Sequence, residues 1–139
     1  MTMHFEYKIE VGYFTRACYA SCQVKRSLKQ LNVDPKVIKR VVVALYEAEV
    51  NIVAHAYSGI IQVYIDTERI RMILTDKGPG IANIEMAMQM GFSTATPEVR
   101  EMGFGAGMGL PNIKKNSDEF KIESEVGNGT KLEIVVYIK

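Results

Sequence analysis

Residues 34–57 read DPKVIKRVVVALYEAEVNIVAHAY, and this stretch decides the fold. It opens with Asp34 and Pro35, an N-cap residue followed by proline at the first helical position, so we expect a helix that ends before Ser58. After Arg40 its only charged residues are two glutamates, and apolar residues cover nearly the whole circumference. A helix that is apolar on all sides packs against more than one neighbour, so we expect it to contact several other elements.

The few polar residues of this helix therefore need an explanation. Glu47, Asn51 and His55 are spaced by four and form one stripe, roughly opposite the apolar stripe of Ile38, Val41, Leu45 and Ile52. A carboxylate one turn from a carboxamide can hold a hard metal ion through oxygen and orient an attacking hydroxyl or water. The alternative is a solvated face with an internal hydrogen bond. We expect His55 to be a structural hydrogen-bonding residue and Glu49, on another face, to be solvated.

Length and composition narrow the class of protein. The chain has 139 residues, which fits one domain over residues 1–139. Its 17 Lys+Arg and 16 Asp+Glu are interspersed, so nucleic acid and an acidic membrane are not expected partners. No apolar run approaches a membrane span and no leader pattern opens the chain, so we expect a cytoplasmic protein. Cys18 and Cys22 form neither a disulfide framework nor a metal site, and we expect buried free thiols.

The remaining elements follow from hydrophobic periodicity. Alternating residues predict a strand at 3–11, and spacings of three and four predict an amphipathic helix at 13–31. Two later runs, at 60–66 and 69–75, predict an antiparallel hairpin. A short helix is expected near 84–88 and a further helix at 108–116. The last two runs, at 120–126 and 130–138, predict two strands. Residues 91–107 have neither period, which indicates a functional lid or disorder.

Eight of the eleven glycines form three clusters. Asp76 ends a predicted strand, and Gly78 and Gly80 follow it. The two glycines would let a ligand approach the backbone closely. The carboxylate can accept a hydrogen bond from an exocyclic amine. The alternative is an ordinary turn. A run of glycines at every second position leads into the helix at 108–116: Gly103, Gly105, Gly107 and Gly109. Their free backbone N–H groups would suit a phosphate. The alternative is a flexible loop without function. The third cluster, GNGT at 127–130, reads as a hairpin turn.

The order of these motifs carries a resemblance. E-x-x-x-N, D-x-G-x-G, G-x-G-x-G and G-x-G-T follow one another, and the chain resembles the gyrase, chaperone, histidine kinase and MutL superfamily of ATP-binding domains over about residues 35–138. Within it, the chain is similar to bacterial anti-sigma-factor serine/threonine kinases and switch kinases. The resemblance implies a Bergerat-type α/β (α+β) two-layer sandwich, with a mixed, mostly antiparallel sheet covered on one face by about three helices.

The same resemblance implies roles at the phosphate end of ATP. Asn51 would coordinate Mg²⁺ that bridges the phosphates, and Glu47 would be the general base for a protein serine or threonine hydroxyl. Arg100 or Lys77 would help to neutralise the triphosphate. The glycines that would wrap the phosphates are Gly103, Gly105, Gly107 and Gly109.

At the adenine end, Asp76 would bind the amino group, and Thr130 would support that network through water. Gly78 and Gly80 would make room for the base. The implied partners are a STAS-domain anti-sigma-factor antagonist and a sigma factor, and a homodimer is possible. Histidine autokinase activity is not expected, because the chain has no room for a separate phosphoacceptor domain. Two further hypotheses are an ATP-controlled binding module without kinase activity and an interaction domain that keeps only the fold.

Overall fold

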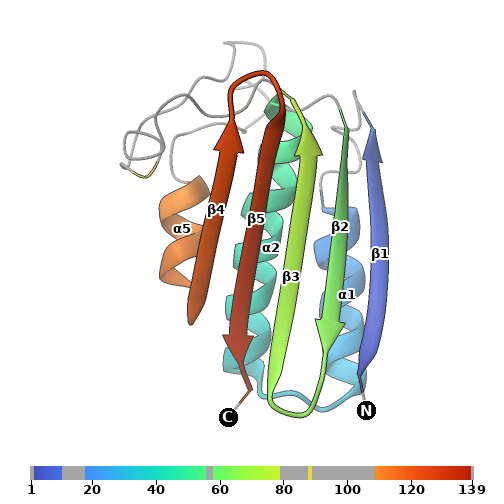
Figure 1. Ribbon diagram of the computed structural model, residues 1–139. Coiled ribbons are helices and arrows are strands. Elements are labelled where there is room, and N and C mark those ends of the chain that lie inside the picture. Colours follow the sequence, from blue (N-terminus) through green and yellow to red (C-terminus); the bar gives the residue numbers. More distant parts are fainter. Residues whose placement is uncertain (1, 11–17, 56–57, 79–87, 89–108, 139) are drawn as a thin grey trace.

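The computed structural model describes residues 2–10, 18–55, 58–78, 88 and 109–138. Figure 1 shows the elements in these ranges, which in chain order are β1 (Met3–Glu10), α1 (Tyr19–Gln30), α2 (Pro35–His55), β2 (Ser58–Ile65), β3 (Arg69–Lys77), α5 (Gly109–Lys115), β4 (Glu119–Glu125) and β5 (Gly129–Tyr137). The predicted strands and helices are confirmed in these ranges, with ends that differ by a few residues. The predicted lid and parts of the helices expected at 13–31 and 84–88 lie outside the described residues.

The strands form one five-stranded sheet in the order β1-β2-β3-β5-β4, and all four pairings are antiparallel. One row of cross-strand partners runs from Tyr7 through Ile61, Leu74 and Leu132 to Ile122. Side chains alternate between the two faces of a strand, so this row and its parallel rows supply one apolar face. The sheet therefore buries a single side.

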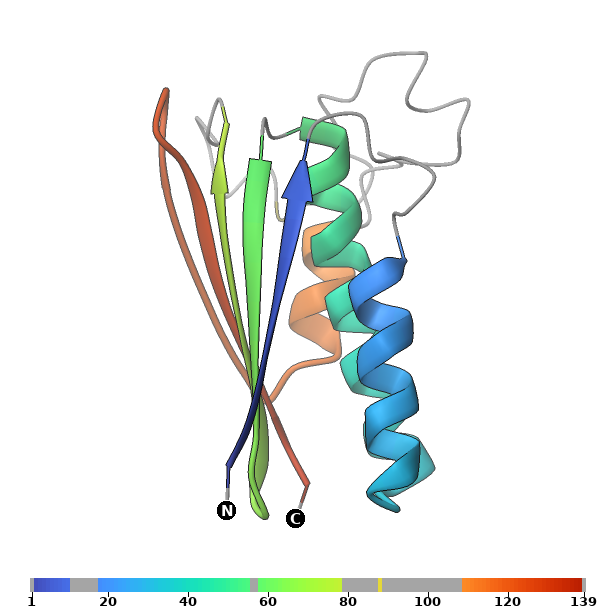
Figure 2. The same cartoon turned by 90° about the vertical axis from the view of Figure 1, so that its right-hand side faces the viewer.

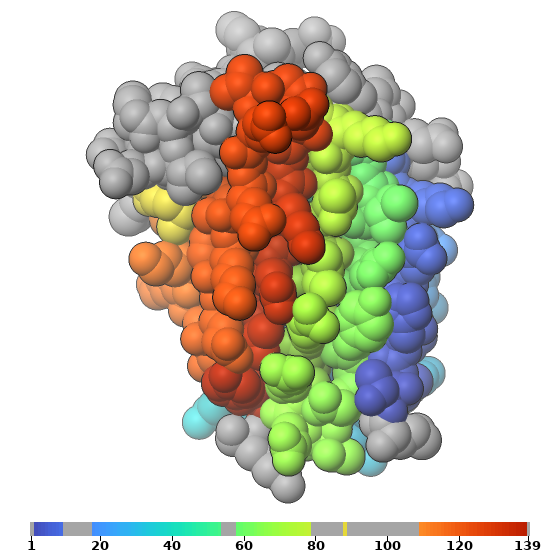
Figure 3. All heavy atoms as spheres, viewed as in Figure 1, coloured from blue at the N-terminus to red at the C-terminus, as the bar shows by residue number. Residues whose placement is uncertain are grey.

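All three described helices cover that apolar side, as Figure 2 shows. Helix α2 lies between α1 and α5 and also contacts the strands, which confirms the expected central helix. Figure 3 looks onto the opposite face, where the described strands are not covered by a described helix. That face carries polar pairs such as Arg71 with Glu133, whose Nε and Oε1 atoms are 2.9 Å apart. The expected two-layer α/β sandwich is confirmed.

Helix α2 begins where the sequence predicted. The backbone N–H of Lys36 donates to Oδ1 of Asp34 at 2.8 Å, which satisfies one of the donors left free at a helix N-terminus. Farther along, Ile52 packs directly on Gly59 of β2, where an added Cβ would lie 2.7 Å from its Cγ2. Glycine at this position lets the C-terminal half of α2 approach the sheet closely. None of the described helices is long and apolar enough to cross a membrane.

The expectation for the two cysteines was wrong. Cys18 and Cys22 are free thiols, but both are exposed. Helix α1 buries Ala20 and Val24, and Cys22 lies two residues from each, which places it about 200° around the helix from the buried stripe. The Cys22 thiol therefore faces away from the sheet.

Candidate functional site

Asp76 lies near the end of β3, on the helix-covered side of the sheet, and meets the start of β5. Its Oδ1 atom accepts a hydrogen bond from the backbone N–H of Thr130 at 3.0 Å. Burial raises the pKa of the Asp76 carboxyl, and the Thr130 N–H opposes this by favouring the charged form. Within the described residues Oδ2 has no hydrogen-bond partner, so this oxygen can accept from a ligand.

Gly129 makes this contact possible. Its φ of +104° favours glycine, and an added Cβ would lie 2.1 Å from the backbone oxygen of Asp76. The turn pattern at 127–130 predicted a hairpin, and the resemblance placed Thr130 in the Asp76 network through water. In the structure the glycine also lets the β5 backbone contact Asp76 directly. The hydroxyl of Thr130 is 2.9 Å from Oγ of Ser124, its partner in the β4–β5 register. Ser124 was not among the predicted site residues, although the pairing of these two strands places it opposite Thr130.

Asn51 lies near the C-terminal end of α2, one turn after Glu47, and both side chains are partly exposed. The first residue of α5, Gly109, lies against the carboxamide: an added Cβ there would be 3.0 Å from Oδ1 and 3.2 Å from Nδ2 of Asn51. The last glycine of the predicted phosphate-wrapping run is thus next to the predicted metal ligand. The side chain of His55 lies outside the described residues.

The described residues of the four motifs lie toward one end of the molecule. The C-terminal ends of α2 and β3 and the N-terminal ends of α5 and β5 all point toward the upper end of the sheet in Figure 1. Gly78 is buried directly after β3, and Lys77 is exposed. The other predicted site residues, Gly80, Arg100, Gly103, Gly105 and Gly107, lie outside the described residues. The roles assigned to all these residues remain predictions.

Glu49, which was expected to be solvated, is only 1% exposed. Its Oε2 accepts from the backbone N–H of Ala20 at 2.8 Å, and its Oε1 accepts from that of Ser21 at 3.2 Å. Helix α1 has no acidic residue in its first turn and no side-chain cap, so Glu49 takes that place from the neighbouring helix. Burial raises the pKa of Glu49 to about 6, although the N–H groups favour the charged form. The expectation was wrong because α1 packs on this face of α2.

The donor set determines which metal the site could hold. Among the described residues no group of three or more His, Cys, Asp or Glu side chains could bind a metal ion by itself. Mg²⁺, however, is typically held by one or two protein oxygens together with nucleotide phosphates and water. The Asn51 carboxamide oxygen is a ligand type that Mg²⁺ accepts, so this residue could hold the ion if nucleotide phosphates and water completed the coordination.

An antiparallel sheet covered on one side by helices, with an acid at the end of β3 and an asparagine near the end of α2, is the arrangement that the motifs predicted for an ATP-binding domain of the histidine kinase type. The family model for the histidine kinase-like ATPase domain matches residues 19–136. The chain belongs to this family, which confirms the resemblance seen in the motifs and the use of ATP.

Individual relatives agree with this assignment. The chain is 33% identical over 104 residues to the serine/threonine-protein kinase RsbT of Bacillus subtilis (strain 168), with 72% of each chain covered. It is 31% identical over 144 residues to the anti-sigma F factor of Thermoanaerobacter sp. (strain X514), covering 98% of this chain and 97% of that protein. Among solved structures, the mycobacterial sensor histidine kinase MprB matches 97% of both chains with a TM-score of 0.55 and 17% identity, a likeness of fold.

Proposed function

We propose that this protein is an ATP-dependent serine/threonine protein kinase of the anti-sigma-factor or switch type, acting in a partner-switching regulatory module. The observation that carries the proposal is the placement of Glu47 one turn before Asn51, where the start of α5 lies against the carboxamide. A carboxylate at this position can take the proton of the acceptor hydroxyl while the carboxamide faces the phosphates. Its relatives include a serine/threonine-protein kinase and an anti-sigma F factor, and both support this class.

The adenine end of ATP would bind at Asp76. Its Oδ1 is held by the Thr130 N–H, so the carboxylate is oriented before the ligand arrives, and Oδ2 would accept from the adenine amino group. Buried Gly78 and its neighbour Gly80 would leave room for the flat base. A carboxylate that must accept two hydrogen bonds is best ionised, and the Thr130 N–H favours that form.

The phosphates would lie between Asn51 and the start of α5. Mg²⁺ bound there through the Asn51 oxygen would offset the charge of the phosphates. The backbone N–H groups around Gly109 would add donors aimed at the same oxygens, with Gly103, Gly105 and Gly107 wrapping the phosphates and Arg100 or Lys77 adding positive charge. The near-neutral chain therefore needs no basic surface to bind a triphosphate.

Glu47 would then act as the general base. It takes the proton of a serine or threonine hydroxyl as that oxygen forms a bond to the γ-phosphorus, and the bond to the bridging oxygen breaks to release ADP. The acceptor would belong to a separate protein, a STAS-domain antagonist of an anti-sigma factor. A sigma factor would be the second partner if this chain also sequesters one.

The test is transfer of radiolabelled γ-phosphate from ATP to a purified STAS-domain partner. We expect Glu47→Gln to lower the turnover number about a hundredfold or more while ATP affinity changes little, because the base is lost and the nucleotide contacts remain. The matched control is Glu68→Gln, an exposed glutamate in the turn between β2 and β3, which should transfer phosphate at the wild-type rate. If wild type and Glu47→Gln bind ATP but transfer phosphate equally poorly, the protein is an ATP-controlled binding module instead.

A further inference from the structure

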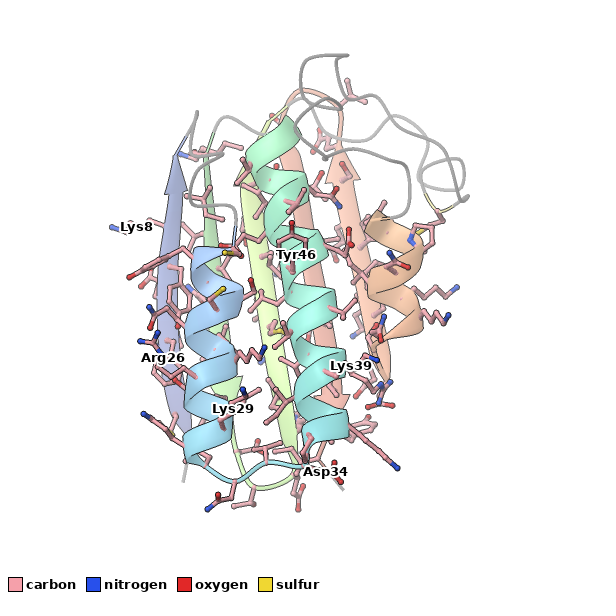
Figure 4. All side chains as sticks on the ribbon, turned by 180° about the vertical axis from the view of Figure 1, so that it is seen from behind. Lys8, Arg26, Lys29, Asp34, Lys39 and Tyr46 are labelled. Carbon is pink, nitrogen blue, oxygen red and sulfur yellow. The ribbon has the colours of Figure 1, made fainter. Side chains whose placement is uncertain are left out.

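A second concave surface lies on the helical layer, away from the proposed nucleotide site. A cavity of about 540 Å³ opens between the C-terminal half of α1 and the N-terminal half of α2. Its walls combine three lysines and an asparagine with an apolar floor: Lys25, Lys29, Lys39, Asn32, Val33, Pro35, Ile38, Val42 and Val43. We call this surface the lysine groove. Figure 4 looks onto it and labels Lys29 on α1 and Lys39 on α2.

The charges of the lysine groove are not balanced. Within the described part of the chain, none of its three lysines forms an ion pair, whereas Arg40 pairs with Asp118 and Arg71 with Glu133. The whole chain carries a net charge of only +1, so three clustered cations are a local excess. Like charges held close together repel, which an acidic partner would relieve.

The floor of the groove is apolar and only partly covered. Val33 and Val42 pack against the core yet remain partly exposed. Tyr46, one turn beyond Val42 on α2, is 37% exposed and extends the apolar surface along the helix. Covering these side chains would remove apolar surface from water, which favours association.

The spacing of these features indicates the shape of the occupant. Lys25 and Lys29 are four residues apart on α1, and Val42 and Tyr46 are four residues apart on α2, so cation and apolar positions recur once per helical turn. A helix lying between two helices presents its own side chains at the same interval. A nucleic acid strand offers phosphates but no matching apolar stripe, and a lipid surface does not fill a concave groove.

From these observations we infer that the lysine groove docks an acidic amphipathic helix of a partner protein, with apolar side chains on the valine floor and carboxylates against the lysines. Asn51 follows Val43 by eight residues on α2, a separation of about 12 Å along the helix axis. The lining of the groove therefore lies about two helical turns from Asn51, whereas a partner that also covers Tyr46 reaches the residue next to Glu47. The inference does not depend on the proposed kinase activity.

The experiment uses the full chain without nucleotide and a fluorescein-labelled peptide of about 18 residues, with leucines at helical spacing and glutamates on both flanks. We expect saturable binding by fluorescence anisotropy, weakened at least about tenfold in the double variant Lys25→Glu/Lys29→Glu. The matched control is Lys8→Glu/Arg26→Glu, which changes the net charge equally at two exposed residues outside the groove, and should bind nearly as wild type. Val42→Ser tests the floor and should also weaken binding.

Several results would overturn the inference. One is absence of peptide binding at about millimolar concentration, the weak limit of specific association. Others are equal binding of a scrambled peptide of the same composition, equal loss in the control variant, or preferential binding of single-stranded DNA or phosphatidylglycerol vesicles through the same lysines. Thermal melting of each variant shows that a loss of binding is not a loss of fold.

Discussion

Glu49 on α2 and Asp76 on β3 are two carboxylates in similar surroundings with different uses. Both lie on the covered side of the sheet, both accept backbone N–H hydrogen bonds, and burial raises the pKa of both. Both oxygens of Glu49 accept a hydrogen bond, one from the N–H of Ala20 and the other from that of Ser21. In Asp76 only Oδ1 accepts one, from the N–H of Thr130. A fully satisfied carboxylate fastens two elements together, and a half-satisfied one is left with an oxygen for a ligand.

The Asp76 side of this comparison depends most on Gly129. In Gly129→Ala the new Cβ would collide with the backbone of Asp76 at a positive φ, so we expect a loss of about 4 kcal/mol in unfolding free energy. Gly127→Ala is the matched control in the same turn: its φ is +86° but its Cβ would meet nothing within 4 Å, so about 1 kcal/mol is expected. Urea denaturation measures both. Equal losses would show that backbone strain alone, without the contact to Asp76, governs this turn.

The Glu49 side is tested by Glu49→Ala. Removing the carboxylate leaves the N–H groups of Ala20 and Ser21 buried without their acceptor, and we expect unfolding free energy to fall by about 3 kcal/mol. Hydrogen exchange should increase first in α1. Glu123→Ala, an exposed residue on β4, serves as the control and should change stability little. A loss below about 1 kcal/mol would contradict a fastening role for Glu49.

The titration of Glu49 gives the next largest effect. Its folded pKa of about 6 lies above the ordinary value of 4.5, so the folded state binds the proton more tightly than the unfolded state. The protonated carboxyl therefore adds to the unfolding free energy. This contribution is complete below pH 4.5 and is lost as pH rises through about 6, which lowers the unfolding free energy by about 2 kcal/mol. The difference in unfolding free energy between wild type and Glu49→Gln should follow this curve. A difference that is constant from pH 4 to about pH 7 would contradict it.

The smallest effect is expected at Ser124, which supports Thr130 from the neighbouring strand. Ser124→Ala removes a hydroxyl that contacts Thr130 and the carbonyl of Gly129, so stability should fall by about 0.5–1 kcal/mol. The backbone hydrogen bond from Thr130 to Asp76 should persist, and ATP affinity should change less than about threefold. A large loss of affinity would assign Ser124 a direct part in nucleotide binding.

The sequence predicted the elements and the order of the motifs, because periodicity, caps and turns are local properties. Asp34 and Pro35 marked the start of α2 correctly, and Asp76 was placed at a strand end. Glu49 was mispredicted because its partners lie 28 and 29 residues away in the sequence, and only the packing of α1 on α2 brings them to it. The contact of Gly129 with Asp76 was missed for the same reason, since a turn motif does not reveal which strand lies beside it.

The most direct test of the comparison is calorimetric titration of ATP with Mg²⁺ into wild type, Asp76→Asn and Glu49→Gln at neutral pH. If Asp76 holds adenine through its free oxygen, Asp76→Asn should weaken binding by about fiftyfold or more, since an amide nitrogen cannot accept from the adenine amino group. Glu49→Gln should bind within about threefold of wild type, because its contacts are internal. Wild-type affinity in Asp76→Asn, or equal weakening in both variants, would show that the free oxygen of Asp76 does not hold adenine.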